Sequence, residues 1–315
     1  MKKLFLLVSV FSFFNVQSQI VIDNTAPYNT PVFLIDNVLL GGGVIATNHS
    51  FIGDSRQIGF FNGINSNLGI DSGIVLSSGD VADIVGPNNS SGTSNSLAPF
   101  PYLPGDATLD ALLYDIYLNT VPLPFSPDST KEAAVLEFDF IPTSDTLSFK
   151  YVFASEEYLE FVNQFNDAFG FFLTGPNPAG GNYVNQNLAI VPGTVNTPVT
   201  INNVNEVVNS AYYIDNGDGF TVPQNTDSTV IQFDGFTTPL TAIAAVNCGD
   251  IYHIKLVVAD VNDGGWDSGV FLEAGSFYSP LLEIADNLGI DSAFMNIPCN
   301  STIKLSASGG VGATY

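Results

Sequence analysis

The sequence has few basic residues and a large excess of acids. Its 315 residues include 7 lysines and arginines against 31 aspartates and glutamates, which gives a formal net charge of −24 at pH 7. A surface with this charge repels phosphate groups, so we expect no nucleic acid and no anionic membrane as a partner. It attracts divalent cations instead, for which carboxylates are common ligands.

Cysteine and histidine are also scarce, with two residues of each type. Cys248 and Cys299 allow one disulfide at most, so disulfides do not form the framework of the fold. Neither the cysteines nor the histidines show the spacing of a zinc site. The sequence also lacks a Gly-x-Ser-x-Gly nucleophile turn and a phosphate-binding glycine loop followed by lysine. These absences argue against the common hydrolase and nucleotide-binding classes.

Apolar runs are short throughout the sequence. Lys2 and Lys3 precede an apolar stretch at 4–14 and a polar stretch at 15–19, which is the pattern of a signal peptide. No later stretch reaches the roughly 18 apolar residues of a membrane helix. We therefore predict a signal peptide over 1–19, no membrane insertion of the mature chain, and an extracellular or outer cell-surface location. An uncleaved anchor is the alternative.

The residues that are present favour β-structure. The 29 glycines and 18 prolines punctuate runs rich in Val, Ile, Thr, Phe and Tyr. The predicted strands include 73–79, 169–173, 251–258 and 269–274. One helix is predicted after Asp106, its N-cap, because four apolar residues recur there at helical spacing and would face the core. These residues are Leu109, Leu112, Leu113 and Ile116.

Two neighbouring runs, 134–140 and 146–153, alternate apolar and polar residues. Aromatic residues dominate the apolar face of both runs, and 142–145 has the composition of a turn. We therefore predict a β-hairpin with an aromatic inner face. A second pattern, Asp-Ser-Gly followed by three apolar residues, two others and Gly, occurs at 71–79 and again at 267–275. It predicts two similar strands, which could be neighbours in one sheet.

Strands separated by turn signals, with a single helix, predict an all-β fold. We expect a β-sandwich or jelly-roll-like domain with one short helix over residues 20–279. A new β pattern begins at Pro280 and continues to the last residue, Tyr315. We interpret 280–315 as the start of a second, truncated Ig-like β domain of a longer surface protein.

Acidic residues lie beside aromatic ones in three segments, 155–161, 166–170 and 260–269. Calcium needs six to eight oxygen ligands, which Asp, Asn, Glu and backbone carbonyls on a glycine-bent loop supply. We predict a Ca²⁺ site on the third segment, with ligands from the other two if the fold brings them together. The candidate ligands are Glu157, Asp167, Asp260, Asp263 and Asp267. The alternative is a solvated acidic turn.

The same segments suggest two further functions. An exposed aromatic ring beside the acids would form a platform for a sugar, and Trp266 and Tyr158 are the candidates. A glycoside hydrolase needs two carboxyl groups across a cleft, which Glu157 with Asp263 or Asp267 could supply. The adjacent Glu156 and Glu157 cannot be that pair, because neighbouring side chains of an extended segment point in opposite directions.

Motifs between Gly69 and Phe277 resemble the choice-of-anchor L domain family, in the order and spacing of that family. They include Leu-Ser-Phe-Lys-Tyr-Val-Phe-Ala-Ser-Glu-Glu-Tyr at 147–158 and Phe-Asn-Asp-Ala-Phe-Gly-Phe-Phe at 165–172. Further matching runs lie at 69–79, 136–140, 234–238 and 267–277. The resemblance implies a domain of exported bacterial proteins that carry varied anchoring or sorting signals. The segment after Pro280 resembles the opening of an Ig-like repeat of Bacteroidetes surface adhesins.

Together these observations predict a secreted or cell-surface binding or adhesion module that is not an enzyme. The expected partners are an extracellular protein or a glycan. The alternatives are a calcium-dependent carbohydrate-binding domain, a glycoside hydrolase and a structural spacer, all of which the residues leave open.

Overall fold

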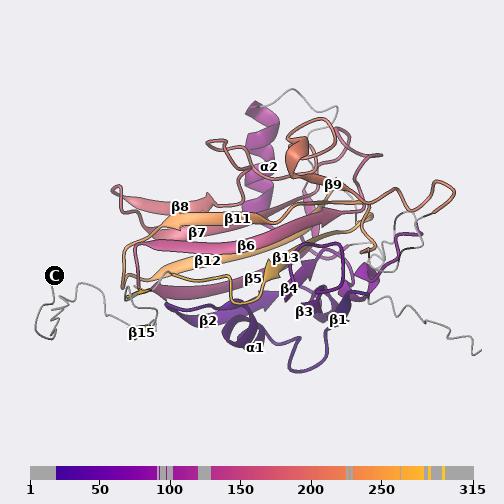
Figure 1. Cartoon of the computed structure of the whole chain (residues 1–315). Helices are drawn as coiled ribbons and strands as arrows, with labels where there is room; N and C mark the ends of the chain where they lie inside the picture. Colours follow the sequence, from indigo (N-terminus) through magenta and orange to yellow (C-terminus); the bar gives the residue numbers. More distant parts are fainter. Residues whose placement is uncertain are drawn as a thin grey trace, which may run out of the picture.

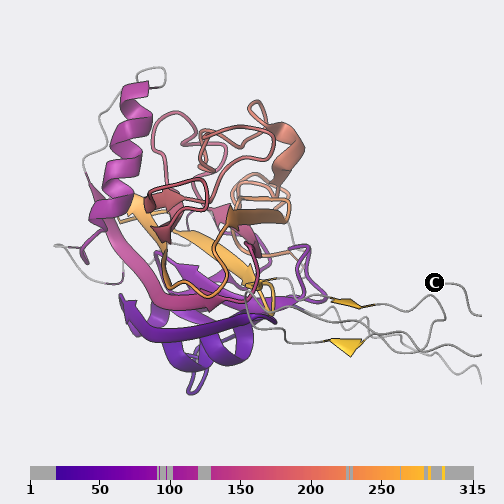
Figure 2. The ribbon, with the colours of Figure 1, turned by 90° about the vertical axis from the view of Figure 1, so that its left-hand side faces the viewer.

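The computed structural model describes residues 19–90, 92, 97, 102–119, 129–224, 227, 230–262, 264–279, 283–284 and 293–294. Its strands form two antiparallel sheets that pack face to face, with α2 standing on the outside (Figures 1 and 2). This architecture confirms the predicted all-β sandwich with a short helix. Within the described residues, no helix is long and apolar enough to cross a membrane.

The first sheet has the strand order β1-β3-β4-β13-β6-β10-β9, and β11 also pairs with β6. Its strands are β1 (Val21–Asp23), β3 (Ile58–Asn62), β4 (Ser72–Ser77), β6 (Thr146–Ser155), β9 (Tyr213–Asp215), β10 (Gly235–Thr237), β11 (Leu240–Ala245) and β13 (Ser268–Glu273). The second sheet has the order β2-β5-β12-β7-β8. Its strands are β2 (Val44–Ile52), β5 (Thr130–Pro142), β7 (Ala168–Pro176), β8 (Asn182–Asn187) and β12 (Tyr252–Val261).

The predicted helix is α2 (Ala107–Asn119), which lies on the outer face of the second sheet (Figure 2). The side chain of Asp106 caps it as expected, since Oδ1 accepts hydrogen bonds from the backbone N–H groups of Thr108 (2.9 Å) and Leu109 (3.0 Å). Leu109 and Leu113 are buried against strand residues of that sheet. We did not predict a second helical segment, α1 (Pro31–Leu34) followed by a short π-helix (Ile35–Leu39), whose buried side chains join the core between the sheets.

Three short 3₁₀ turns complete the regular structure outside the sheets. They are Ser55–Gln57, Val81–Ile84 and Ser210–Tyr212. The first two begin at Asp54 and Asp80, whose carboxylates accept hydrogen bonds from backbone N–H groups of the turn. Both of these turns contact β4 of the first sheet.

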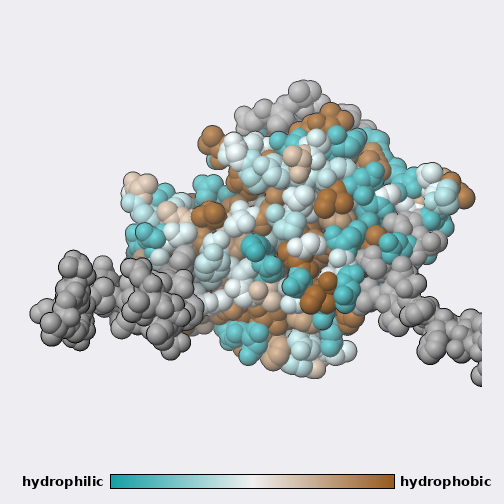
Figure 3. All heavy atoms as spheres, in the orientation of Figure 1, coloured by the Kyte–Doolittle hydropathy of each residue, from teal (hydrophilic) through white to brown (hydrophobic). Residues whose placement is uncertain are grey.

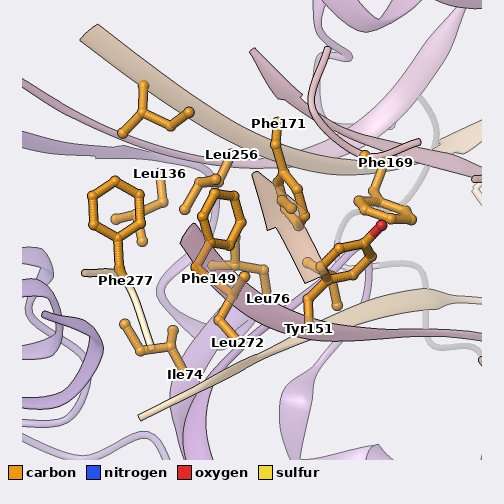
Figure 4. Close-up of a cluster of buried hydrophobic side chains, with 14 of the residues drawn as sticks. Ile74, Leu76, Leu136, Phe149, Tyr151, Phe169, Phe171, Leu256, Leu272 and Phe277 are labelled. Atoms are coloured by element: carbon orange, nitrogen blue, oxygen red, sulfur yellow. The ribbon is translucent and has the colours of Figure 1, made fainter. Parts of the chain in front are cut away.

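The main core lies between the two sheets and is rich in phenylalanine (Figure 4). Phe149 contacts Phe171 with ring centroids 5.0 Å apart and Phe277 with centroids 5.2 Å apart. Two smaller cores lie on the outer faces, one around Phe61 and Phe271 and the other beneath α2. Because both sheets are covered on both faces over part of their area, their central strands are apolar on both sides.

The predicted hairpin at 134–153 is wrong in one respect. Both strands exist, as β5 and β6, but they do not pair with each other, because β5 belongs to the second sheet and β6 to the first. The turn between them carries the chain from one sheet to the other. Their aromatic faces therefore meet across the sandwich, and Phe277 contacts both Phe138 of β5 and Phe149 of β6. Alternation predicts which face of a strand is buried but not its partner strand.

The repeated Asp-Ser-Gly pattern gives the expected pair of neighbours. β4 and β13 pair in antiparallel register, with Gly269 opposite Ser77 and Glu273 opposite Gly73. Gly73 is required by close approach, because a Cβ atom there would lie 1.7 Å from the carbonyl oxygen of Leu272.

Only two short strands are described beyond residue 279, β14 (Glu283–Ile284) and β15 (Ala293–Phe294), which pair with each other. The Ig-like domain therefore remains a prediction, since most of 280–315 lies outside the described residues. Cys248 takes part in a disulfide, and Cys299 also lies outside the described residues.

Candidate cation site at the acidic end of the sandwich

The three acidic segments of the sequence meet at one end of the sandwich. Ser155 at the end of β6 pairs with Ser268 at the start of β13. In the other sheet, Ala168 at the start of β7 pairs with Ala259 near the end of β12. These registers place Glu157, Asp167, Asp260 and Asp267, four of the five predicted ligands, in the same region. We call these four residues the inner acids.

Asp167 connects the two sheets. Its Oδ1 accepts a hydrogen bond from the backbone N–H of Val261 (2.9 Å), and its Oδ2 accepts one from the hydroxyl of Ser268 (2.8 Å). The backbone N–H of Asp167 in turn donates to the Glu157 carboxylate (3.3 Å). All of these groups are buried. The contacts fix Glu157 and Asp167 relative to the ends of both sheets.

Asp260 is the most deeply buried of the inner acids, with no exposed surface. Neither of its carboxylate oxygens accepts a hydrogen bond of normal geometry. The hydroxyl of Ser78 lies nearby and favours the charged form of the carboxylate. Burial raises the pKa of Asp260 well above its ordinary value, and the neighbouring Asp167 and Asp267 raise that pKa further. An ionised carboxylate in such surroundings is costly unless a positive charge compensates it.

Asp267 is 3% exposed, and its carboxylate lies against the backbone of Gly79, two residues after β4. A Cβ atom at Gly79 would lie 1.7 Å from Oδ2 of Asp267, so only glycine leaves room for this carboxylate. The carbonyl of Asp267 accepts a hydrogen bond from the backbone N–H of Glu156 (3.0 Å). The repeated Asp-Ser-Gly pattern therefore serves the site directly, because the glycine that ends its first copy accommodates the aspartate that begins its second.

None of the ion pairs between described residues involves Asp260. The basic side chains of these pairs bind other acids at other places on the surface, such as Lys150 with Glu273 and His253 with Asp139. Lys255 likewise pairs with Asp106 at the start of α2. Lys131, which lies opposite Asp260 in the β5–β12 register, forms none of these ion pairs, and its Nζ donates to Ser129 instead.

Two further buried acids lie next to the inner acids, and the sequence did not mark them as a site. Glu156 is 1% exposed with its Oε2 unpartnered, and Asp234 is 2% exposed and accepts a hydrogen bond from Asn88 (2.8 Å). Burial raises the pKa of Asp234 to about 8, and Glu160 adds to the effect. Asp234 is the first residue of 234–238, one of the runs that resemble the family named above. That resemblance was the signal in the sequence that could have identified this acid. Glu156 and Glu157 lie in the turn that follows β6 and not in an extended segment, so the premise for their predicted opposite orientation does not hold.

The aromatic candidates differ in exposure. Tyr158 is fully buried, so its ring offers no face to a ligand, and the platform hypothesis is wrong for this residue. Trp266 is 39% exposed, and its ring centroid lies 4.8 Å from that of Phe161. Phe161 also contacts Phe165, with ring centroids 5.5 Å apart. We call Phe161, Phe165 and Trp266 the aromatic trio. The sequence did not predict the two phenylalanines.

The backbone is strained around the inner acids. Leu159, Asn163, Asn262 and Trp266 all adopt left-handed conformations, with φ between 60° and 75°. For a residue with a Cβ atom this region costs roughly 1–2 kcal/mol, less for asparagine. Strain of this kind persists where the surrounding contacts fix the local conformation, which is typical of a functional site.

Asp263, the fifth predicted ligand, lies outside the described residues. Among those that are described, no three Asp, Glu, His or Cys side chains converge closely enough to hold an ion as they stand. The inner acids are thus assembled in one buried region, but side-chain rotation would be needed to bring their oxygens around a common point.

The comparison with family models decides the family. The model of the choice-of-anchor L domain matches residues 21–278. The chain belongs to the choice-of-anchor L domain family. This family comprises surface-associated domains and is not a known enzyme family. No curated protein and no solved structure matches the chain.

The acids of this choice-of-anchor L domain are poorly placed for glycoside hydrolysis. Glu157 and Asp267 are 1% and 3% exposed, so a sugar cannot lie between them in the observed arrangement. Oxygen-rich, buried and negatively charged surroundings are better suited to hold a hard cation.

Proposed function

We propose that this choice-of-anchor L domain is an exported, non-catalytic binding module for adhesion at the cell surface, and that a divalent cation organises its acidic end. Family membership and the all-β scaffold support the binding role. The deep burial of the carboxylates supports a role in structure or binding rather than in catalysis. The partner in this proposal is an extracellular protein or a glycan.

One observation carries the cation: Asp260 is fully buried, neither of its oxygens accepts a hydrogen bond of normal geometry, and the nearby acids Asp167 and Asp267 raise its pKa. A bound cation would supply the positive charge that the ionised carboxylate of Asp260 needs. Calcium fits best because it accepts six to eight oxygen ligands in irregular geometry, whereas magnesium demands a near-ideal octahedron. Zinc is disfavoured, since its usual nitrogen and sulfur ligands are not found among the inner acids.

Terbium luminescence tests this site directly. Tb³⁺ takes the place of Ca²⁺ at oxygen-rich sites, and Trp266, the only tryptophan of the chain, precedes Asp267 and would sensitise its emission. We expect tryptophan-excited emission that added Ca²⁺ reverses. The double variant Asp260→Asn, Asp267→Asn should lose the signal. Trp266→Phe should lose the sensitised emission while retaining calcium-dependent thermal stabilisation. Emission that survives the double variant would place the ion elsewhere.

A second candidate function is calcium-dependent carbohydrate binding at the aromatic trio. The partly exposed ring of Trp266 supports it, because an aromatic face beside a cation can stack on a sugar ring. This function predicts that Trp266→Ala abolishes glycan binding while the chain still binds calcium. A purely structural spacer predicts cation binding with no glycan or protein partner.

A further inference from the structure

A hollow of about 550 Å³ separates α2 from β8 on the outer face of the second sheet. Thr108 and Asp115 of α2 form one wall, and Asn185 and Gln186 of β8 form the other. Phe172 of β7, which is 2% exposed, lies at its base. We call this hollow the helix-side groove. Its volume is within the range of small-molecule sites, roughly 300–1,000 Å³.

A second hollow of about 500 Å³ lies on the other side of the loop that follows β8. Tyr183 of β8, Thr194 of the loop and Thr241 of β11 contribute to its lining. We call it the edge-side groove, since it separates β8 from β11. Gln186 and Asn196 line both grooves, so the two hollows adjoin along one ridge.

The ridge between the grooves is rigid. The backbone N–H of Val191 donates to Thr197 (2.8 Å) and that of Val199 donates to Ala189 (2.9 Å), which closes the loop on itself. Buried Asn187 holds its start, because Oδ1 accepts from the backbone N–H groups of Phe171 and Ala189. A preformed site loses little conformational entropy when a ligand binds.

The grooves differ from the rest of the molecule in charge. No charged side chain is found among the described residues that line the edge-side groove, and Asp115 is the only one in the helix-side groove. In a chain of net charge −24, this is an unusual stretch of surface. Amides, hydroxyls and one tyrosine provide its polar groups. Amides and hydroxyls both donate and accept hydrogen bonds, as the hydroxyl groups of a sugar require.

We propose that the two grooves together bind an uncharged, hydroxyl-rich chain, that is, a neutral polysaccharide. The protein's field repels an acidic glycan, and the edge-side groove offers no carboxylate to a basic one. Tyr183 supplies an aromatic ring that is held in place, since its hydroxyl donates to the carbonyl of Ala245 (3.1 Å). The inference names a ligand for the proposed binding module and rests on that function, but it does not require the cation.

Exposed apolar side chains border the grooves. Val184 of the helix-side groove is 77% exposed, and Val195 and Ile243 of the edge-side groove are 89% and 62% exposed. On the face that carries β8 and β11, small apolar patches lie between hydrophilic ones (Figure 3). Such a mixed surface suits a sugar chain, whose rings present apolar faces between hydroxyl groups.

An added peptide strand is a less suitable occupant. β8 is the edge strand of its sheet, but Asn185 has a left-handed φ of 48° and the β7–β8 register shifts between Leu173 and Gly175. A bulge of this kind interrupts the row of backbone groups that a further strand would use. The geometry therefore favours side-chain recognition over strand addition.

Affinity electrophoresis of the full chain in gels that contain a β-glucan, a mannan, a xylan or acidic alginate tests the proposal, with EDTA present throughout. We expect at least one neutral polysaccharide to retard the protein and alginate to have no effect. The variant Gln186→Ala, Asn196→Ala should weaken that retardation at least tenfold. Both side chains are on the surface and make at most one weak hydrogen bond, so the thermal midpoint should stay unchanged. Asn65→Ala, which removes an exposed amide that lines neither groove, is the matched control and should behave as the parent.

Three results would overturn the proposal. They are no retardation by any neutral polysaccharide, equal retardation by alginate, and retardation that Trp266→Ala abolishes but the double variant leaves intact. The last result would assign the glycan to the aromatic trio and would show that its binding there does not need calcium. EDTA removes any bound cation in this experiment. A lack of polysaccharide binding would therefore not bear on the proposed cation site, which the terbium emission tests separately.

Discussion

Two buried tyrosines differ in what their hydroxyl groups contact. Tyr151 is fully buried in the core, and its hydroxyl has no hydrogen-bond partner. Burial raises the pKa of this hydroxyl far above its ordinary value. Because an unpartnered buried hydroxyl is unfavourable, we expect Tyr151→Phe to leave the free energy of unfolding unchanged or to raise it by about 1 kcal/mol. Urea denaturation measures this difference.

Tyr252→Phe is the matched control. The Tyr252 hydroxyl accepts from the backbone N–H of Asn247 (2.6 Å) and donates to the carbonyl of Pro176 (2.8 Å). We expect its removal to lower the free energy of unfolding by about 1–2 kcal/mol, because two backbone groups lose their partner. Equal effects of the two substitutions would show that the Tyr151 hydroxyl is satisfied in solution.

At the residue scale, composition was enough to find the inner acids but not to describe their surroundings. Three acidic, aromatic segments predicted Glu157, Asp167, Asp260 and Asp267, and the fold brings these four together. The burial of Tyr158 could not be predicted, because it sits in a turn, where no periodicity marks the buried side. Asp234 was missed because it is a single acid in an otherwise apolar run.

At the element scale, the start of α2 offers a test of capping. Asp106 caps the helix through Oδ1, and its carboxylate also pairs with Lys255 of β12. We expect Asp106→Ala to lower the free energy of unfolding by about 2 kcal/mol, roughly half from each interaction. Asp106→Asn keeps the cap and should lose only about half as much. An alanine variant as stable as the parent, by chemical denaturation, would contradict this role.

The sequence predicted elements better than their partners. Helical spacing gave α2 and its buried side, and alternation gave β5, β6, β7, β12 and β13 near their observed bounds. The sheet to which each strand belongs follows from long-range pairing, which single-strand patterns do not carry. The β4–β13 pair was an exception, because a repeated motif marked both strands.

For the whole molecule, the buried acids predict an unusual dependence of stability on pH. The pKa of Asp234 is about 8 in the folded protein, and its ordinary value is 3.8. At a pH between these two pKa values, Asp234 holds a proton in the folded state that it has released in the unfolded state. In EDTA, we therefore expect the free energy of unfolding to fall by up to about 1.4 kcal/mol per pH unit for this group as pH rises from about 4 to about 8.

The variant Asp234→Asn should flatten this slope without abolishing it. Other acids face Asp234, namely Glu156, Glu160, Asp215 and Asp218, and burial also raises the pKa of Glu156 and Glu160. These two groups contribute in the same direction as Asp234. Denaturation curves of both proteins at several pH values provide the comparison. A parent protein that is more stable at pH 8 than at pH 5 in EDTA would contradict the predicted protonation of the buried acids.

Thermal unfolding of the full chain at pH 7.5, in EDTA and then in millimolar calcium, tests the cation site most directly. A cation that binds only the folded state adds about 2.7 kcal/mol at a hundred times its dissociation constant. For a domain of this size that corresponds to a rise of roughly 5–10 °C. We predict such a rise, and its loss in the Asp260→Asn, Asp267→Asn variant. An unchanged midpoint with calcium, and equally with magnesium, would contradict a cation at the acidic end.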